Sequence, residues 1–416
     1  MRRKLKVHLA LAGLLVILAL PSETGQAQMG PIRIGATWPL TGPIAASGKD
    51  MLNGWELFLS DAHNTIAGRP VEFIMEDSGG VPANTLTKVR KLVERDRVHL
   101  LVGAGLLASE GYAVRDYIVQ SQTPLLFGVV SADDLTQRQR APYLLRLGWT
   151  SSQPSHPFAD YIFGNFKYRR IAMIANDYAF SYEVTGGFHR RFEELGGCIV
   201  QKIWVPLNTP DHSPYVSQIR RDVDAVFANF VGADVIRFVK QYDEFGLKGR
   251  LPLIGGGLLS DESLLRSMGD EAIGNMSALH WSAALDRTEA KQFVAMYTAK
   301  YGTAPSYYAE GLYTTGRWLE AAARRVRGNV ENKDAFMDAV RGVELYNAPR
   351  GPLRMDKYQN PIENIYVRRV DTVAGTLVNS VIYTFPAISQ FGSYKPEEFL
   401  ANPVYSRDYP PLRPCK

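Results

Sequence analysis

Short apolar runs alternate with longer segments of helical periodicity along most of this 416-residue chain. Eight of the runs are apolar at nearly every position, which is typical of strands buried on both faces of a parallel sheet. They lie at 32–36, 71–76, 100–103, 124–130, 171–175, 199–204, 225–230 and 251–255. Amphipathic helices are expected between them, at 50–63, 83–95, 109–121, 157–166, 184–195 and 233–245. Strand–helix alternation repeated this often predicts doubly wound α/β units.

The eight units fall into two sets of four, because the segment LRLGWTSSQPSHP interrupts the pattern near 148–154. Later segments add two long helices, at 289–301 and 307–327, and a β-like stretch at 352–370 that continues to 382–385. A chain of this length exceeds one hydrophobic core. We therefore expect two parallel-sheet lobes, the first from 28–148 plus 279–350 and the second from 149–278 plus 351–385. Several crossovers would join them and allow closure on a ligand, and 386–416 would wrap the surface.

The N-terminus has the pattern of a secretory signal peptide. Basic residues among the first six precede an apolar run at 7–20, and Gly25-Gln26-Ala27 offers small residues for a cut before Gln28. Fourteen apolar residues are too few for a membrane span, which needs about 20. Residues 1–27 carry four basic side chains and one acidic one, so a chain cut there keeps a net charge near +2 instead of +5. The sequence therefore predicts an exported protein, without stable membrane insertion and without nucleic acid as a partner.

Two cysteines, Cys198 and Cys415, are the only candidates for a disulfide. Export to an oxidising compartment permits the bond. Two independent thiols are the alternative, because sequence does not reveal the geometry that pairing requires.

Motifs for catalysis or cofactor binding are weak. Gly103-Ala104-Gly105-Leu106-Leu107-Ala108 matches a dinucleotide fingerprint, but it follows the third strand and no acidic residue ends the next one. We interpret it as a tight turn that places Ser109 at a helix N-terminus, where free N–H groups attract a carboxylate. The EDSGG of 76–80 lacks the context of a protease serine, and the seven histidines form no metal-binding spacing. We expect no enzyme activity, no cofactor and no metal.

Aromatic residues recur where strands end. Examples are Trp38, Tyr178, Phe180 and Phe230. Ligands of open α/β sheets bind beyond the carboxyl ends of the strands, so this recurrence favours an aromatic-lined cleft between the lobes.

Three segments resemble type I periplasmic solute-binding proteins of the branched-chain amino acid ABC transporter family. They are IRIGATWPLTGPIAASGKDMLNGWELFL, VEFIMEDSGGVPANTLTKVRKLVERDRVHLLVGA and YAFSYEVTGGFHRRFEELGG, supported by GPLRMD near residue 351. The resemblance spans residues 31 to about 385. It implies a periplasmic protein whose two lobes, joined by three hinge crossovers, close on a small ligand. It also implies delivery of that ligand to an inner-membrane ABC permease by a monomeric receptor. The tail SYKPEEFLANPVYSRDYPP resembles a subgroup associated with aromatic-compound uptake.

The resemblance also assigns roles to residues. The family holds a ligand carboxylate with a serine at a helix start, here Ser109, and with a turn that corresponds here to Val129-Val130-Ser131. The family's ligand-facing aromatics correspond to Phe180 and Tyr308. Together with the strand ends, this gives twelve candidate ligand-binding residues: Trp38, Ser47, Ala108, Ser109, Val129, Val130, Ser131, Tyr178, Phe180, Phe230, Gly257 and Tyr308.

The family's glutamate for the ligand ammonium is missing, since Gly255-Gly256-Gly257-Leu258 stands at its position. A buried ammonium without a counter-charge is costly, so the sequence favours an aromatic or hydrophobic carboxylic acid. Asp261 or Glu262 turning into the role keeps branched-chain amino acids and small amides as alternatives. A ligand-sensing receptor and an exported enzyme on the same scaffold are the competing functions. Replacement of Ser109 by Ala is expected to weaken carboxylate binding by about 1–3 kcal/mol.

Overall fold

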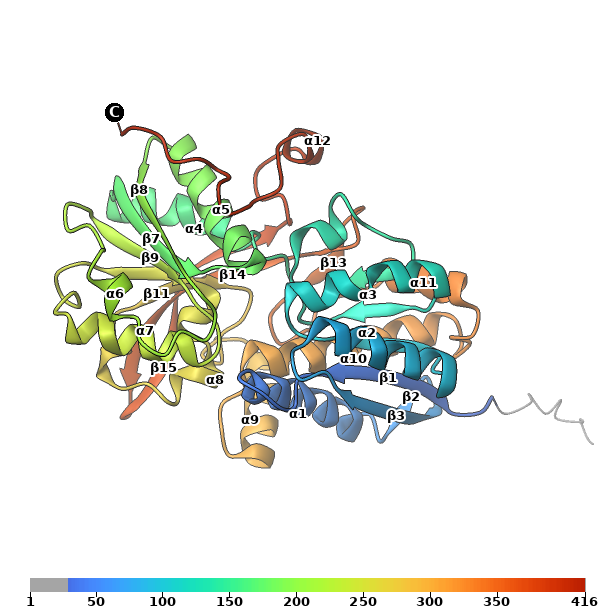
Figure 1. Ribbon diagram of the computed structural model, residues 1–416. Helices are drawn as coiled ribbons and strands as arrows, with labels where there is room; N and C mark the ends of the chain where they lie inside the picture. Colours follow the sequence, from blue (N-terminus) through green and yellow to red (C-terminus); the bar gives the residue numbers. More distant parts are fainter. Residues whose placement is uncertain (1–28, 416) are drawn as a thin grey trace, which may run out of the picture.

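A computed structural model of the protein describes residues 29–415, so the expected signal peptide lies outside the described residues. The first lobe contains a six-stranded sheet of order β2-β3-β1-β4-β5-β6, parallel except where β2 meets β3 (Figure 1). Its strands are β1 (Ile32–Trp38), β2 (Thr65–Ile66), β3 (Arg69–Asp77), β4 (Leu100–Ala104), β5 (Leu125–Phe127) and β6 (Leu144–Arg146). Its helices are α1 (Ala45–Asp61), α2 (Pro82–Arg90), α3 (Ala108–Ser121), α9 (Thr288–Tyr301), α10 (Tyr307–Arg325) and α11 (Lys333–Arg341).

The second lobe is built on a larger, mixed sheet of order β12-β13-β14-β11-β10-β9-β7-β8, with β15 paired to β14. Its strands are β7 (Arg170–Asn176), β8 (Cys198–Val205), β9 (Ala225–Asn229), β10 (Leu253–Gly256), β11 (Met276–Leu279), β12 (Glu344–Leu345), β13 (Leu353–Met355), β14 (Pro361–Val373) and β15 (Thr376–Ile388). Strands β7 to β11 are parallel, whereas β12 to β15 run antiparallel to their neighbours. Its helices are α4 (Ser155–Tyr161), α5 (Ala179–Glu194), α6 (Ser213–Val216), α7 (Ala233–Glu244) and α8 (Glu262–Leu265).

The predicted α/β class is confirmed, and every one of the eight predicted strands is present. The pattern worked because the central strands are buried on both faces; all five residues of β4 are buried, for example. The sequence analysis missed β6 and β11, whose apolar runs are only three and four residues long. It also missed α11, which begins where the side chain of Asn332 caps the helix.

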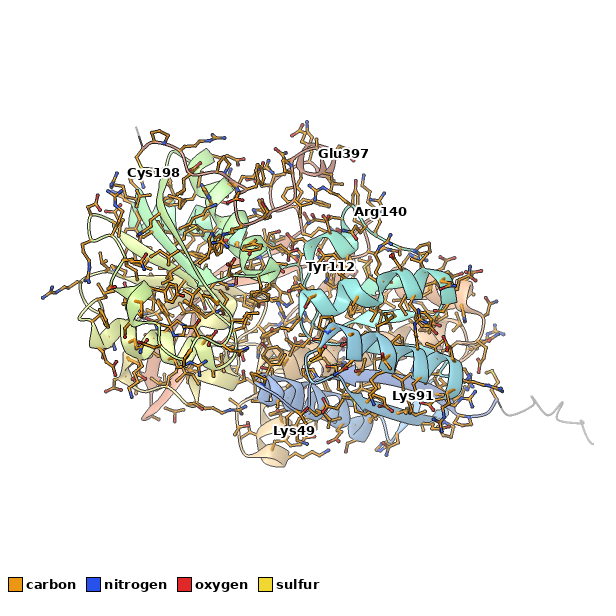
Figure 2. The ribbon with its side chains drawn as sticks, in the orientation of Figure 1. Lys49, Lys91, Tyr112, Arg140, Cys198 and Glu397 are labelled. Carbon is orange, nitrogen blue, oxygen red and sulfur yellow. A yellow bond between two sulfur atoms is a disulfide. The ribbon has the colours of Figure 1, made fainter. Side chains whose placement is uncertain are left out.

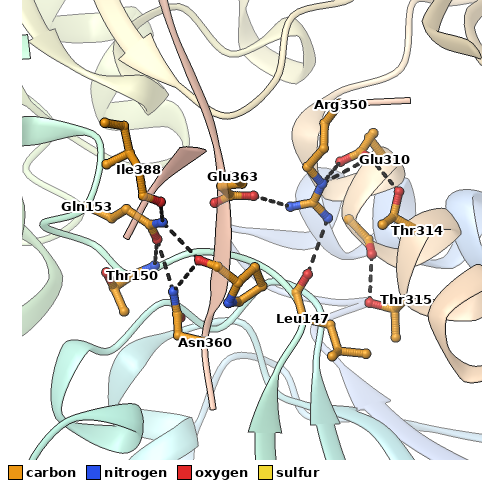
Figure 3. Close-up of polar contacts among 12 residues, drawn as sticks. Leu147, Thr150, Gln153, Glu310, Thr314, Thr315, Arg350, Asn360, Glu363 and Ile388 are labelled. Carbon is orange, nitrogen blue, oxygen red and sulfur yellow. Dashed lines mark hydrogen bonds and ion pairs between the residues drawn. The ribbon is translucent and has the colours of Figure 1, made fainter. Parts of the chain in front are cut away.

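The chain passes between the two lobes three times, after β6, after β11 and between α11 and β13, where the two-residue β12 already pairs with β13. The first crossover follows the predicted break, but it is not an exposed linker, because residues 147–155 are all buried. Gln153 anchors it: Gln153 Nε2 donates to the carbonyls of Pro361 (3.1 Å) and Ile388 (2.9 Å), and Gln153 Oε1 accepts the Thr150 N–H (Figure 3). A buried polar segment of this kind restricts the hinge to few conformations.

A buried ion cluster joins the first and third crossovers to α10 and β14 (Figure 3). Arg350 pairs with Glu310 at 3.0 Å and with Glu363 at 3.2 Å, and all three side chains are fully buried. Its Nη2 also donates to the Leu147 carbonyl at 3.5 Å. One guanidinium faces two carboxylates, and burial raises the pKa of Glu363 to about 8 despite the charge of Arg350.

Residues 389–415 form what we call the C-terminal strap, which contains α12 (Pro396–Leu400) and contacts both lobes. Arg138 of the first lobe donates to the Asn402 carbonyl at 2.7 Å, and the Tyr394 hydroxyl donates to Glu194 on α5 at 2.5 Å. The strap ends in a disulfide between Cys415 and Cys198 on β8, with Cα atoms 5.6 Å apart, so the cysteines are paired. Figure 2 shows how far this end lies from Glu397 on α12.

Candidate functional site

A small cavity with an empty volume of about 280 Å³ lies between the lobes, beyond the carboxyl ends of the parallel strands. Ligands of open α/β sheets bind at such strand ends. The first lobe contributes Leu106, Leu107, Ala108, Val129 and Ser131, the second lobe contributes Tyr178, Phe180, Val231 and Leu258, and Tyr307 comes from the start of α10. A larger hollow of about 1110 Å³ beside β15 has no lining residue at the end of a parallel strand, so it lies away from this site.

The turn between β4 and α3 forms the first-lobe wall. Gly105 has a φ of +78°, and a Cβ there would lie 2.4 Å from Glu110, so the turn requires glycine. Glu110 Oε2 in return accepts the N–H groups of Leu106 and Leu107, both at 2.9 Å. The glycine motif therefore serves a capped turn that presents Leu107, at the N-cap of α3, to the cavity.

Aromatic rings form the opposite wall. Tyr178 is the N-cap of α5, and its ring centroid lies 5.9 Å from that of Phe180. Trp149 of the first crossover packs edge-on against both Phe180 (6.0 Å) and Tyr307 (5.8 Å). Edge-to-face packing of this kind fixes ring orientation, so the crossover holds the two cavity rings in place.

The cavity is apolar with a few neutral hydroxyls. Burial raises the pKa of the Tyr178 and Tyr307 hydroxyls far above the ordinary value, so both stay protonated and can donate. Ser131 adds a third hydroxyl, 3.0 Å from that of Ser151. No charged side chain is present among the ten lining residues. Helices α3, α5 and α10 all begin at this wall, and helix N-termini favour negative charge.

Five of the twelve predicted site residues line the cavity. They are Ala108, Val129, Ser131, Tyr178 and Phe180. The structure places the other seven outside it: Trp38, Ser47, Ser109, Val130, Phe230, Gly257 and Tyr308.

Most of these seven residues are sequence neighbours of a residue that lines the cavity. Ser109 is exposed one residue beyond Ala108, and the side chain of Val130 points toward Gly111 of α3, between two cavity-facing neighbours. Phe230 stacks on Phe238 inside the second lobe with centroids 4.5 Å apart, so its neighbour Val231 faces the cavity.

The remaining four have structural contacts. The Gly257 carbonyl accepts a hydrogen bond from Arg368, while Leu258 lines the cavity. Tyr308 lies behind Tyr307, with ring centroids 4.0 Å apart, and its hydroxyl bonds to Ser47.

Trp38 belongs to the core of the first lobe. It is fully buried in the first-lobe core against Phe73, with centroids 5.9 Å apart.

The two carboxylates suggested as substitutes for the missing glutamate have other partners. Asp261 accepts the N–H groups of Ser263 (3.0 Å) and Tyr307 (3.3 Å), and burial raises its pKa to about 7. Glu262 accepts from Asn379 and from the Ala283 N–H, both at 3.1 Å. Neither side chain lines the cavity.

The sequence analysis missed Leu106, Leu107, Val231, Leu258 and Tyr307 as lining residues. Each of them except Leu106 is the sequence neighbour of a predicted residue, so the loops named from the sequence do border the cavity.

Two further features concern membranes and metal ions. No helix among residues 29–415 combines the length and apolar composition needed to cross a bilayer, and in the same range no three His, Cys, Asp or Glu side chains are grouped to hold a metal ion.

Comparison with known proteins agrees with this geometry. The family model described as "Periplasmic binding protein" matches residues 31–376. Leu/Ile/Val-binding protein homolog 6 of Brucella suis biovar 1 is 27% identical over 384 residues, covering 89% of this chain and 95% of that protein.

Solved structures match as well. An ABC transporter substrate-binding protein from Sphaerobacter thermophilus has 39% identity and a TM-score of 0.82, covering 86% of this chain and 99% of that chain. A solute-binding protein of Rhodopseudomonas palustris BisB5, in complex with 3,4-dihydroxybenzoic acid, has 31% identity and a TM-score of 0.82 (86% and 98% covered). One from strain HaA2, in complex with p-hydroxybenzoic acid, has 26% identity and a TM-score of 0.81 (87% and 98%).

Proposed function

We propose that this chain, which belongs to the periplasmic binding protein family and is an ABC transporter solute-binding protein, captures an aromatic carboxylic acid between its lobes. The observation that carries the proposal is the composition of the cavity wall: three aromatic rings, aliphatic side chains, three neutral hydroxyls and no charged side chain. Flat rings gain affinity from stacking and edge contacts. A carboxylate finds hydroxyl donors and three helix N-termini there.

The same wall disfavours an α-amino acid. A buried ammonium needs a carboxylate partner, and the two candidates named from the sequence, Asp261 and Glu262, are held by backbone N–H groups and Asn379. The relatives crystallised with hydroxybenzoic acids support the aromatic ligand. The curated relatives named for leucine, isoleucine and valine keep a branched-chain amino acid as the second candidate.

A thermal unfolding screen decides between the two. A ligand that binds only the folded protein at 100 times its Kd stabilises it by about 2.7 kcal/mol. We expect 4-hydroxybenzoate and 3,4-dihydroxybenzoate to raise the unfolding midpoint, and leucine and isoleucine to leave it unchanged. Benzamide is the matched control, because it keeps the ring and removes the charge. Stabilisation by leucine alone would exclude the aromatic ligand.

Delivery of the ligand to an inner-membrane permease completes the proposed function. A sensing role is the alternative, in which the closed protein is presented to a receptor. Stimulation of a reconstituted permease's ATPase by the liganded protein supports import, and its absence together with binding to a sensor kinase supports sensing. The expected periplasmic location and signal cleavage before Gln28 are checked by N-terminal sequencing of the exported protein.

A further inference from the structure

Glu183 on α5 carries a carboxyl group from the second lobe into the first. Its Oε1 accepts the Asp133 N–H at 3.1 Å and the Tyr112 hydroxyl at 3.4 Å, and only 2% of the residue is exposed. Tyr112 lies on α3, and Figure 2 shows it at the boundary between the lobes. These contacts exist only when the lobes are together, so opening of the cleft breaks them.

Asp133 of the first lobe places a second buried carboxyl group beside Glu183 of the second lobe. Its Oδ1 accepts the Ser152 N–H at 3.1 Å. Asp133 Oδ2 and Glu183 Oε2 are both buried without a hydrogen-bond partner. Two adjacent buried carboxylates repel each other, and each unpartnered anionic oxygen is costly. One proton on the pair removes both problems.

The nearest cation does not replace that proton. Arg146 is fully buried, and its guanidinium donates to neutral acceptors. These are the carbonyls of Val130 and Ala132, the hydroxyl of Thr136 and the amide oxygen of Asn360. Other titratable or charged groups around the pair are Tyr112, Asp134 paired with Arg138, Asp356 bonded to Gln390, and Tyr405 beside Arg190. Burial raises the pKa of Asp133 to about 6 and that of Glu183 well above its ordinary value.

The serine hydroxyls beside the cavity do not satisfy the carboxyl pair. The Ser151 hydroxyl donates to the carbonyl of Ser131 at 3.0 Å and lies 3.0 Å from its Oγ, and Ser131 lines the cavity. The Ser151 proton is therefore engaged with Ser131, and Glu183 Oε2 keeps no hydrogen-bond partner. A proton on the carboxyl pair itself removes the charge on that oxygen.

We propose that closure of the lobes buries Glu183 with a proton beside Asp133, so that ligand capture takes up a proton. The proton comes from solvent, and no covalent bond other than its own O–H changes. The readout through ligand affinity rests on the proposed function, whereas the buried carboxyl pair does not depend on ligand identity.

Ligand affinity then depends on pH. In the open form a solvated glutamate has a pKa of about 4.3, and in the closed form burial raises the pKa of Glu183. Closure takes up a proton between these two values, so affinity falls as pH rises through this window, by at most tenfold per pH unit. Below the open-form pKa the dependence vanishes.

Calorimetric titration with 4-hydroxybenzoate at pH 6, 7 and 8, in phosphate and in Tris, measures both affinity and proton uptake. We expect uptake of up to one proton by the wild type, and a pH-independent affinity without uptake for Glu183→Gln. The neutral amide needs no proton on closure, so this variant should bind at pH 8 at least as well as the wild type, whereas Glu183→Ala should bind weakly at every pH because it loses the contacts with Asp133 and Tyr112. Glu244→Gln, an exposed control on α7, should retain the wild-type profile. A flat wild-type profile, or equal profiles in wild type and Glu183→Gln, would overturn the proposal.

The same titration with whichever ligand raises the unfolding midpoint separates this inference from the proposed function. For any ligand on which the lobes close, wild-type affinity should fall between pH 6 and pH 8 relative to that of Glu183→Gln, because a raised pKa in the closed form gives stability that is lost as pH rises. A ratio of the two affinities that does not change with pH contradicts the inference even if aromatic acids bind. Failure of every aromatic acid to bind contradicts the proposed function alone.

Discussion

Single positions decide which side chains meet the ligand. The sequence analysis named Phe230 and Tyr308 as candidates, whereas their neighbours Val231 and Tyr307 line the cavity. Successive side chains alternate between faces at a strand end, so an error of one residue exchanges cavity for core. Composition does not resolve this, because an aromatic residue suits either environment.

Ser131 and Ser109 form a direct test of this assignment. Ser131 lines the cavity, whereas Ser109 is exposed. Loss of a hydrogen bond to a charged group costs about 1.5–3 kcal/mol, so Ser131→Ala should weaken aromatic acid binding by about 10-fold to 100-fold. Ser109→Ala should bind like the wild type, which replaces the expectation drawn from the sequence. Calorimetry of both variants checks this, and equal losses would show that the carboxylate lies nearer α3.

A second pair of variants separates binding from stability. Phe180 lines the cavity, and its replacement by Leu should reduce affinity for an aromatic acid by about 1 kcal/mol through lost ring contacts. Phe230 is fully buried against Phe238, so Phe230→Ala should lower the free energy of unfolding by about 3–5 kcal/mol and leave the affinity of the folded protein unchanged. Denaturant unfolding and calorimetry together measure both quantities. The reverse pattern would place Phe230 in the site.

At the level of elements, hydrophobic patterning predicts the long, doubly buried strands and most helices correctly. It fails for β6 and β11, which are too short to show a period, and for the buried first crossover. The segment at 148–154 has the composition of a linker, but it is buried, and the side-chain oxygen of Gln153 accepts the Thr150 N–H inside the hinge. The local hydrophobic pattern does not reveal which residues far apart in the sequence contact each other. The same holds for the two cysteines, which are 217 residues apart.

The disulfide should stabilise the protein through the strap. Closing so long a loop restricts the unfolded chain, and removal of a native disulfide costs about 2–5 kcal/mol. The Cys198→Ser/Cys415→Ser double variant should therefore unfold at lower denaturant than the wild type. A reducing agent should destabilise the wild type and have no effect on the double variant. Identical unfolding curves would mean that the strap's noncovalent contacts with Arg138 and Glu194 suffice.

For the whole molecule, affinity depends on how often the lobes are closed as well as on contacts with the ligand. If only the closed form binds, the apparent Kd is the intrinsic Kd divided by the closed fraction. Contacts between the lobes that lie outside the cavity therefore alter binding. One such contact joins Arg266, at the end of α8, to Asp50 on α1 at 3.3 Å.

Arg266→Gln should weaken ligand binding about threefold although Arg266 does not line the cavity. The effect is modest because a third of the Arg266 side chain is exposed and solvent screens the pair. Asp50 stays hydrogen-bonded to the hydroxyl of Ser306 at 2.7 Å, so no buried charge is stranded. Affinity of the wild type should also fall with added salt, and that of the variant should fall less. Arg237→Gln is the matched control: Arg237 is similarly exposed, but it pairs with Asp234 inside the second lobe. Its affinity and salt dependence should equal those of the wild type, and an equal loss in both variants would assign the effect to general electrostatics instead of closure.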